Sequence, residues 1–462
     1  MKLEVSIGEA IDKYSILEIK LKKITEIHKL CDVQNEINQL QECKSIIERE
    51  PFFYDILIYF NTEIWNLTDT IKLMSITDEK FSIIAQRIFD LNQKRFRVKN
   101  LFNQIFSSNT VEQKSYASTY CELFLANEEV FYDKIAEINY LLFEYDYLLI
   151  DTKYLPLFHK VLKDRSNFIL DKKEVLDPPL SPVKAEEVGD LVAQRRKKSI
   201  NLTDFTIDTS IVPIFTPKPI SYVATGKLGD FIQSISIINE KFYSTGRKGV
   251  LFIREDNGNF ANGLVNTYND TLEVICSQKY IVDYKIYNNE TVDIDLSIWY
   301  LNRELLYRTN WVEIFKNTYN ENWGHHKWFH LPYNEKWKDK VLINEMHYRK
   351  ATNIDYNELY KIYGSSLIFI SFQKTEYEVF VRDTGLNIEH YMPKSFTEAC
   401  IAINSCKLLV AALSGILTIG HACHKKRIIG IGPGGNFNGD NIHNLNFNKY
   451  WDNVFYDVAH IN

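Results

Sequence analysis

The spacing of apolar residues changes in character along this chain. Between about residues 6 and 106, apolar side chains recur at steps of three and four positions, and polar residues fill the other faces. This period is typical of amphipathic helices. The clearest stripes, at 7–27, 37–47, 53–74 and 81–105, predict an antiparallel helical bundle or a long helical hairpin.

A different composition separates this region from the second half of the chain. A further helical stretch covers about 130–150, and the next segment, 171–219, combines a basic run at 195–198 with frequent prolines. That composition predicts an extended, partly ordered linker. The basic run is interpreted as a solvated face of the linker, with contact to anionic lipid as the alternative. The prolines are Pro178, Pro179, Pro182, Pro213, Pro217 and Pro219.

From residue 220 onward, short apolar runs alternate with helical periods. Such alternation predicts buried parallel strands in an α/β fold. The pattern starts again near residue 340, which predicts two Rossmann-like lobes. The expected strands lie at 220–225, 249–253, 280–287, 341–343, 366–372, 408–413 and 427–431, and the expected helices at 264–277, 301–315, 356–363 and 398–403.

Two strand-to-helix turns carry the candidate chemistry. The first is 226–230, which reads GKLGD, and the second is Ser414-Gly415, where an apolar run stops and helical spacing resumes. A small hydroxyl and bare backbone amides at a helix N-terminus bind anions well, so the two turns predict a nucleotide pocket between the lobes. Asp230 has a simpler alternative, as a carboxylate that complements the helix dipole.

Composition narrows the class of protein. The chain has 462 residues, enough for two or three domains, and its formal net charge of -6 argues against a dedicated nucleic-acid binder. Its seven cysteines form no CxxC pair, which fits a reducing compartment. No signal peptide is visible, and no apolar run reaches the ~18 residues that a membrane span requires. We therefore expect a cytoplasmic protein.

Histidines gather at two places, 325–330 and 421–424. Neither group has the carboxylate or cysteine arrangement typical of zinc, so no metal site and no resident cofactor are expected. The serines lack a Gly-x-Ser-x-Gly elbow, which argues against a hydrolase of that type.

The region 220–450 resembles the GT-B glycosyltransferases, and within them the heptosyltransferase-like group. In that group a glycine-aspartate turn of the first lobe faces a Ser-Gly or Thr-Gly turn of the second lobe that opens a helix. Here these are Gly229-Asp230 and Ser414-Gly415. The stretches 395–399 (SFTEA) and 402–407 (AINSCK) are similar to that group's helix-then-strand approach to the second turn.

Two departures from the heptosyltransferase pattern affect the second turn. That group usually carries an aspartate directly before the Ser/Thr-Gly pair and a histidine in the helix just after it, where this chain has Leu413 and Thr418. The donor contacts are therefore altered, and the identities of the sugar and the base do not carry over. The glycine-aspartate pair is retained, so the resemblance assigns the role of base to Asp230.

The first 120 residues resemble an uncharacterised helical family found in bacterial surface-polysaccharide loci. The resemblance lies in residues 7–20, which read IGEAIDKYSILEIK, and 112–116, which read EQKSY. It implies that the chain acts on a surface polysaccharide.

Together the resemblances imply an inverting, metal-independent glycosyltransferase. It would move a sugar, with a heptose as one candidate, from a nucleotide-sugar donor to a growing polysaccharide of the capsule or lipopolysaccharide type. The acceptor hydroxyl must lose its proton to a carboxylate, the role of Asp230. Helix-terminal amides and basic side chains would stabilise the departing diphosphate. The expected donor-binding residues are Gly226, Lys227, Gly229, Arg349, Glu376, Ser414, Gly415 and Thr418.

Three of these residues have specific roles and alternatives. Arg349 is a diphosphate candidate because a guanidinium group pairs phosphate oxygens bidentately. Glu376 would accept a ribose hydroxyl, or it is a helix-start carboxylate. Lys227 would reach the phosphates, or it is a solvated lysine.

The expected fold class is α/β: a GT-B-like pair of Rossmann-type lobes preceded by an all-α bundle or hairpin. Its parts are a helical domain at 1–126, a helical segment with a Pro-rich linker at 127–219, an acceptor-side lobe at 220–335 and a donor-side lobe at 336–462. The expected partners are a nucleotide-sugar donor and a glycan or glycolipid acceptor, and no nucleic acid. The N-terminal stripes also predict a homodimer through these helices, and peripheral contact with the inner membrane stays open.

Two other functions stay open. A catalytically silent scaffold would bind a nucleotide sugar and recruit partners through the helical domain; Leu413 favours this hypothesis and Asp230 opposes it. A nucleotide-sugar epimerase with the same two-lobed fold would need further carboxylates and histidines beside the nucleotide.

Overall fold

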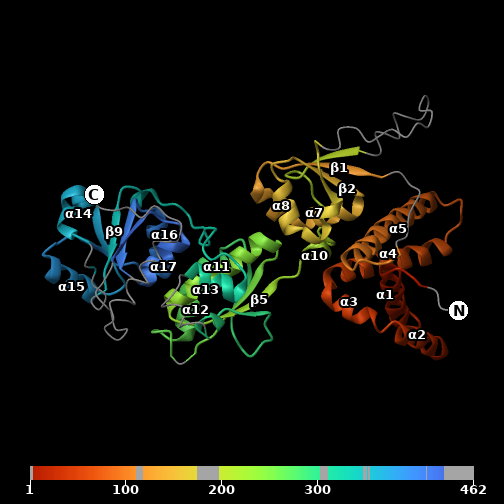
Figure 1. Ribbon diagram of the computed structural model, residues 1–462, viewed down its shortest axis with the longest axis horizontal. Helices are drawn as coiled ribbons and strands as arrows, with labels where there is room; N and C mark the ends of the chain where they lie inside the picture. The colour runs from red at the N-terminus through yellow and green to blue at the C-terminus, as the bar shows by residue number, and fades with distance from the viewer. Residues whose placement is uncertain are drawn as a thin grey trace. The chain divides into compact units, whose positions relative to one another are not determined.

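The computed structural model describes residues 4–110, 118–173, 197–256, 258–301, 311–346, 351, 354–412 and 414–430 (Figure 1). The chain divides into two units, Met1–Lys218 and Pro219–Asn462. This division is adjacent to the expected start of the first lobe. Within the described ranges, no helix is both long and apolar enough to cross a membrane.

The first unit begins with a group of helices, shown in red and orange in Figure 1. Ser6 caps the first helix by accepting a hydrogen bond from the Glu9 amide at 3.2 Å. The first, fourth and fifth helices pack around a core that includes the fully buried Leu57 and Phe102, so the expected helical region is confirmed. The helices are α1 (Ile7–Lys23), α2 (Ile27–Gln39), α3 (Cys43–Arg49), α4 (Pro51–Lys72) and α5 (Glu79–Ile105).

The same unit also contains a parallel sheet that the sequence pattern did not predict. Its strands are β1 (Tyr120–Phe124), β2 (Tyr147–Ile150), β3 (Ile169–Asp171) and β4 (Lys197–Asn201), in the order β3-β2-β1-β4. Helices α6 (Glu128–Asp133), α7 (Ile135–Glu144) and α8 (Leu155–Val161) and the short helix η1 (Lys163–Phe168) lie between the first three strands in the chain.

The expected linker is wrong for residues 197–215. This segment supplies β4 to the sheet, and it continues into α10 (Val212–Phe215). Phe215 is fully buried, with its ring centroid 6.1 Å from that of Phe60 and 6.4 Å from that of Phe143. Residues 174–196, including three of the six expected prolines and part of the basic run, lie outside the described residues.

The second unit opens with a four-stranded parallel sheet in the order β7-β6-β5-β8. Gly249 lets a strand approach the preceding helix closely, because a Cβ atom there would lie 2.4 Å from Ile238 Cγ2. The expected helix at 301–315 is observed from Trp311, and residues 302–310 lie outside the described residues. The elements are β5 (Ile220–Ala224), α11 (Leu228–Thr245), β6 (Gly249–Ile253), α12 (Leu264–Cys276), β7 (Ile281–Ile286), β8 (Ile294–Asp295) and α13 (Trp311–Tyr319).

A five-stranded parallel sheet follows, in the order β11-β10-β9-β12-β13. Its central strands are entirely buried, as the continuous apolar runs predict. The elements are η3 (Glu335–Trp337), β9 (Val341–Asn344), α14 (Tyr356–Tyr363), η4 (Gly364–Ser366), β10 (Leu367–Ile370), α15 (Lys374–Thr384), β11 (Glu389–Tyr391), α16 (Phe396–Ser405), β12 (Leu408–Ala412), α17 (Gly415–Ala422) and β13 (Arg427–Gly430). The expected α/β class, with two Rossmann-like lobes in a GT-B-like pair behind a helical region, is therefore confirmed.

A segment rich in tryptophan joins these two lobes. The indole N–H of Trp323 donates to Gln233 O at 3.0 Å, and that of Trp328 donates to Ile232 O at 3.0 Å. The Trp328 backbone amide donates in addition to Ala422 O at 3.1 Å. The connection is thus bonded to α11 of the first lobe and α17 of the second, and these two helices also pack against each other.

Candidate functional site

Both lobes of the second unit have a topological switch point, where the chain turns back to the other side of its first strand. In the first lobe this point lies between β5 and β8, and in the second between β9 and β12. Ligands of open α/β sheets bind outside the carboxyl ends of the strands at such points. The two turns singled out in the sequence directly follow β5 and β12.

Asp230 lies in the first turn of α11, next to the switch point of the first lobe. Its Oδ2 accepts a hydrogen bond of 2.7 Å from the hydroxyl of Tyr300, which follows β8. Gly226, which precedes α11, has a φ of +114°, and a Cβ atom there would lie 2.5 Å from the Tyr300 hydroxyl. Glycine is therefore required at position 226 both by the backbone and by the approach of the tyrosine.

Lys227 stands at the N-cap position of α11 with an exposed side chain. This position allows it to reach a ligand and equally allows it to be solvated. Both interpretations of Lys227 therefore stay predictions.

Arg254 is a cation that the sequence analysis missed at the same edge of the first sheet. It directly follows β6, and its guanidinium group pairs with Asp256 at 3.0 Å and with Asp295, the last residue of β8, at 3.3 Å. It also donates to Ser297 Oγ at 3.2 Å. Its place directly after a buried apolar run is the signal that could have identified it.

The second lobe carries an equivalent pair across its switch point. Ser414 donates a hydrogen bond of 3.0 Å to Oδ1 of Asn344, the last residue of β9. Asn344 is buried, and its amide nitrogen donates to Ile370 O at 2.9 Å. Asn344 was not predicted from the sequence, although it directly follows an expected strand at the edge where Ser414 lies.

Ser414 caps α17, since its hydroxyl oxygen accepts from the Leu417 amide at 3.4 Å. The Thr418 hydroxyl, which is buried, donates to Ser414 O at 3.2 Å. Both hydroxyl protons thus have acceptors within the chain. The groups of this turn that suit an anion are the first backbone amides of α17, beginning with Gly415, because such amides have no intrahelical acceptor.

The two turns meet each other. A Cβ atom at Gly229 would lie 3.3 Å from Thr418 Oγ1 and 3.9 Å from Gly415 Cα. The N-terminal turn of α11, with Asp230, is therefore in contact with the N-terminal turn of α17. This is the juxtaposition expected from the two sequence motifs.

For the other expected donor residues, the structure either allows both interpretations or does not describe the residue. Glu376 is half-buried in the first turn of α15, after β10, a place that suits both a ribose contact and a helix-start carboxylate. Arg349 and Leu413 lie outside the described residues.

The histidines near the second turn are held neutral by their surroundings. His421 is fully buried on α17, and its Nδ1 lies 3.2 Å from an Arg427 guanidinium nitrogen. Burial, and then the charge of Arg427, hold the pKa of His421 well below its usual value. Burial also lowers the pKa of His424 to about 4, with Arg427 adding to the shift. Within the described ranges, no three His, Cys, Asp or Glu side chains are grouped so as to hold a metal ion.

Comparisons with known proteins found a family model that matches the N-terminal region and several solved structures that are similar to this chain. Residues 1–123 match a family of unknown function, DUF6165. No curated protein matches the chain significantly.

Among solved structures, the chain is similar to a glycosyl transferase of family 9 from Veillonella parvula, with 13% identity, 48% of this chain and 83% of that chain covered, and a TM-score of 0.32. It is similar to the E. coli heptosyltransferase WaaC with an ADP-2-deoxy-2-fluoro heptose, with 11% identity, 48% and 90% of the chains covered, and a TM-score of 0.32. The dodecameric iron-containing heptosyltransferase TibC, in complex with ADP-D-beta-D-heptose, shares 13% identity over 47% of this chain and 59% of its own, with a TM-score of 0.27.

Proposed function

We propose that this chain is an inverting glycosyltransferase that moves a sugar from a nucleotide-sugar donor to a glycan or glycolipid acceptor without a bound metal. The observation that carries the proposal is the contact between the two turns, in which Gly229 packs on Thr418 and Gly415. Asp230, which can accept a proton, and the α17 N-terminus, which can hold a diphosphate, therefore lie on adjoining turns.

In this mechanism Asp230 takes the proton of the acceptor hydroxyl as the acceptor oxygen attacks the anomeric carbon of the donor. Tyr300 holds the carboxylate through its hydrogen bond to Oδ2, so the base keeps one orientation. The bond between the anomeric carbon and the diphosphate oxygen breaks as the glycosidic bond forms on the opposite side. Attack from that side inverts the configuration at the anomeric carbon.

The departing diphosphate is proposed to face the N-terminus of α17. Unpaired amides and the helix dipole give this end a partial positive charge that suits an anion. Because the Ser414 and Thr418 hydroxyls donate within the chain, the proposal assigns the phosphates to the amides beginning at Gly415. Lys227 and Arg349 are the proposed basic side chains.

A heptose or hexose is the proposed sugar, and a capsule or lipopolysaccharide-type polysaccharide the proposed product. Glu376 is proposed to accept a hydroxyl of the donor's ribose. These assignments depend on the resemblances of residues 7–20 and 220–450 to their families. The reaction is proposed to take place in the cytoplasm, at the inner face of the membrane where a glycolipid acceptor is accessible.

A catalytically silent scaffold is the second candidate. The observation that favours it is that both hydroxyls of the second turn are used within the chain, and that Leu413 replaces the usual aspartate. In this case the turns would bind a nucleotide sugar and no sugar would be transferred.

The deciding experiment measures release of nucleoside diphosphate by the full chain, with ADP-heptose, UDP-glucose and GDP-mannose as donors and a glycolipid extract as acceptor. Transfer by the natural chain and a fall of about 10²–10⁴-fold in Asp230→Asn would support a catalytic base. Asp270→Asn, at an exposed carboxylate of α12 in the same lobe, is the matched control and should keep full activity. Full activity in Asp230→Asn would contradict the assignment.

Homodimerisation through the N-terminal helices is proposed from the apolar stripes at 7–27 and 53–74. Light scattering on the full chain at micromolar concentration tests it, and a monomer mass would contradict it. Peripheral membrane contact is tested separately by sedimentation with vesicles that contain anionic lipid.

A further inference from the structure

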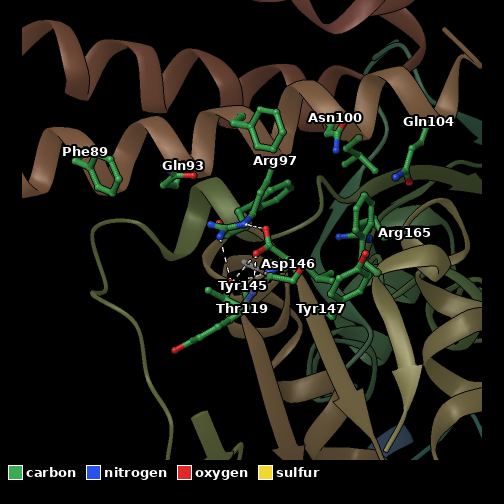
Figure 2. A pocket seen from close by; sticks show the side chains of 16 residues that line it. Phe89, Gln93, Arg97, Asn100, Gln104, Thr119, Tyr145, Asp146, Tyr147 and Arg165 are labelled. Carbon is green, nitrogen blue, oxygen red and sulfur yellow. Dashed lines mark hydrogen bonds and ion pairs between the residues drawn. The ribbon is translucent and has the colours of Figure 1, made fainter. Parts of the chain in front are cut away.

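A cavity of about 420 Å³ lies inside the N-terminal unit, far along the chain from the turns described above (Figure 2). Its volume falls within the range of ~300–1,000 Å³ that is typical of small-molecule sites. One wall is α5, from which Asn100 and Gln104 project toward Tyr147 of β2 and Arg165 of η1. The remaining lining includes aromatic side chains, among them Phe96 and Phe168.

Arg165 is the unusual group in this lining. Its side chain is only 8% exposed, and within the described residues no carboxylate lies within ion-pair distance of it. One guanidinium nitrogen donates to Asn139 Oδ1, and the group lies 5.2 Å from the ring centroid of Phe53. Its Nε is buried and has no acceptor in the described part of the chain.

The charge of Arg165 persists at neutral pH. Burial lowers the pKa of its guanidinium to about 10, and the more distant carboxylates of Asp164 and Glu50 act against this shift. A buried cation that lacks an ion-pair partner is costly, since burial removes its hydration. An anion inside the cavity would supply the missing partner.

The second arginine of the cavity provides an internal comparison. Arg97 donates to Asp146 Oδ1 at 2.8 Å, to Phe143 O at 3.0 Å and to Thr119 Oγ1 at 3.3 Å. The dashed lines of Figure 2 show this network along one side of the cavity. Arg97 is thus hydrogen-bonded within the protein, whereas the Nε–H of Arg165 has no acceptor in the described part of the chain.

Asn100 adds to the lining of the cavity a second buried polar atom without a partner among the described residues. Its Oδ1 atom is buried and accepts no hydrogen bond in the described part of the chain. A ligand that satisfies both side chains carries an anionic acceptor for Arg165 and a hydroxyl or amide donor for Asn100. The aromatic lining favours a ring as the body of that ligand, because ring faces pack well on aromatic side chains.

From these contacts we propose that the cavity binds a small hydroxylated ring compound with one acidic group, of the sugar-phosphate or sugar-acid class. The acidic group pairs with Arg165, and a ring hydroxyl donates to Asn100. This inference does not depend on the proposed glycosyl transfer, because every residue that it uses lies in the N-terminal unit.

The test is calorimetric titration of the full chain with four probes: glucose 6-phosphate, glucuronate, inorganic phosphate and glucose. The first two compounds separate a phosphate from a carboxylate as the acidic group, and binding of at least one of them is expected. Inorganic phosphate and glucose should bind at least tenfold more weakly than that compound. Equal binding of inorganic phosphate or glucose, or no binding of either acidic sugar, would overturn the proposal.

Variants locate the binding in the cavity. Arg165→Gln should weaken the acidic sugar about tenfold or more, since a hydrogen bond to a charged group is lost. Asn100→Leu, on the surface of α5 facing the cavity, should also weaken it, and it provides a second test where Arg165→Gln fails to fold. Arg87→Gln, at an exposed arginine of α5 paired with Glu63, is the matched control and should bind as the natural chain does. Unchanged binding in both cavity variants would place the ligand elsewhere and overturn the proposal.

Discussion

The hydroxyl of Tyr300 donates a 2.7 Å hydrogen bond to Oδ2 of Asp230, and so joins the residues that follow β8 to the first turn of α11. The bond crosses the switch point of the first lobe. It connects the proposed base to a side chain that is distant in the sequence, and Gly226 provides the room that this contact needs.

Tyr300→Phe should therefore lower kcat about tenfold and leave the KM for the nucleotide sugar unchanged. The substitution keeps the ring, which stacks on Trp299 at a centroid distance of 3.8 Å, and removes only the hydrogen bond that orients the carboxylate. Initial rates over a range of donor concentrations measure both constants. A proportional change in both constants, or none in kcat, would show that Tyr300 does not position the base.

Gly229→Val should destabilise the C-terminal unit by about 1–3 kcal/mol, as overpacking does in tight contacts. Already the first added carbon would lie 3.3 Å from Thr418 Oγ1, and the branched side chain extends beyond it. Chemical unfolding measures the loss. Thr418→Ala in the same chain should restore part of it by removing the opposing atom, and the absence of any rescue would contradict a direct contact between the turns.

Ser414→Ala should cost about 1–2 kcal/mol of stability, because it removes the cap of α17 and leaves Asn344 Oδ1 without this donor. It should also weaken binding of the nucleoside diphosphate, since the capped turn is the proposed anion site. Ser395→Ala removes the equivalent cap of α16 in the same lobe and should cost similar stability without affecting nucleotide binding. Isothermal titration separates the two variants, and equal nucleotide affinity in both would argue against the anion site.

Phe215→Ala should destabilise the N-terminal unit by about 3–5 kcal/mol, the usual cost of deleting a buried aromatic ring. The side chain is fully buried, and its ring packs on Phe60 of α4 and on Phe143 of α7. Phe124→Ala, at a phenylalanine that is 45% exposed in the same unit, should cost much less. Denaturant unfolding compares the two, and equal costs would mean that residues 197–215 do not pack as described.

The partly buried His424, which lies just after α17, predicts loss of stability in acid. His424 has a pKa of about 4 in the folded chain against an ordinary value of 6.5, so the unfolded chain takes up protons that the folded chain excludes as pH falls below about 6.5. Its contribution to stability is present above pH 6.5 and is lost as pH falls toward 4. His424→Gln should therefore flatten the pH dependence of the unfolding temperature in this window, whereas His28→Gln, at an exposed histidine, should not. An unchanged slope in His424→Gln would contradict this origin.

The sequence predicts those parts of the fold in which one hydrophobic pattern continues over many residues. The helical stripes and the buried runs of the C-terminal sheets are extended enough to stand out. The N-terminal sheet was missed because β2 and β3 have only four and three residues, and because β4 follows a stretch whose prolines and charges are typical of a linker.

The sequence predicted those residues of the candidate site that lie within the two strand-to-helix turns. Parallel strands end at one edge of their sheet, so Asp230 and Ser414 could be placed from the turns alone. Tyr300 could not, because the connection from β8 carries no pattern that directs its side chain toward Asp230. Arg254 and Asn344 stand at strand ends, and the same rule applied to every strand would have selected them.

The three sheets have one more consequence, for folding during synthesis. Each sheet takes its strands from one continuous stretch of chain. In each sheet the first strand pairs on one side with the second strand and on the other side with the fourth: β1 with β4, β5 with β8, and β9 with β12. A sheet of this order cannot be completed before its fourth strand emerges, because parallel pairing is non-local. Translation can therefore finish each sheet before the next begins, and we expect the growing chain to acquire its protease-resistant parts in three steps from the N-terminus.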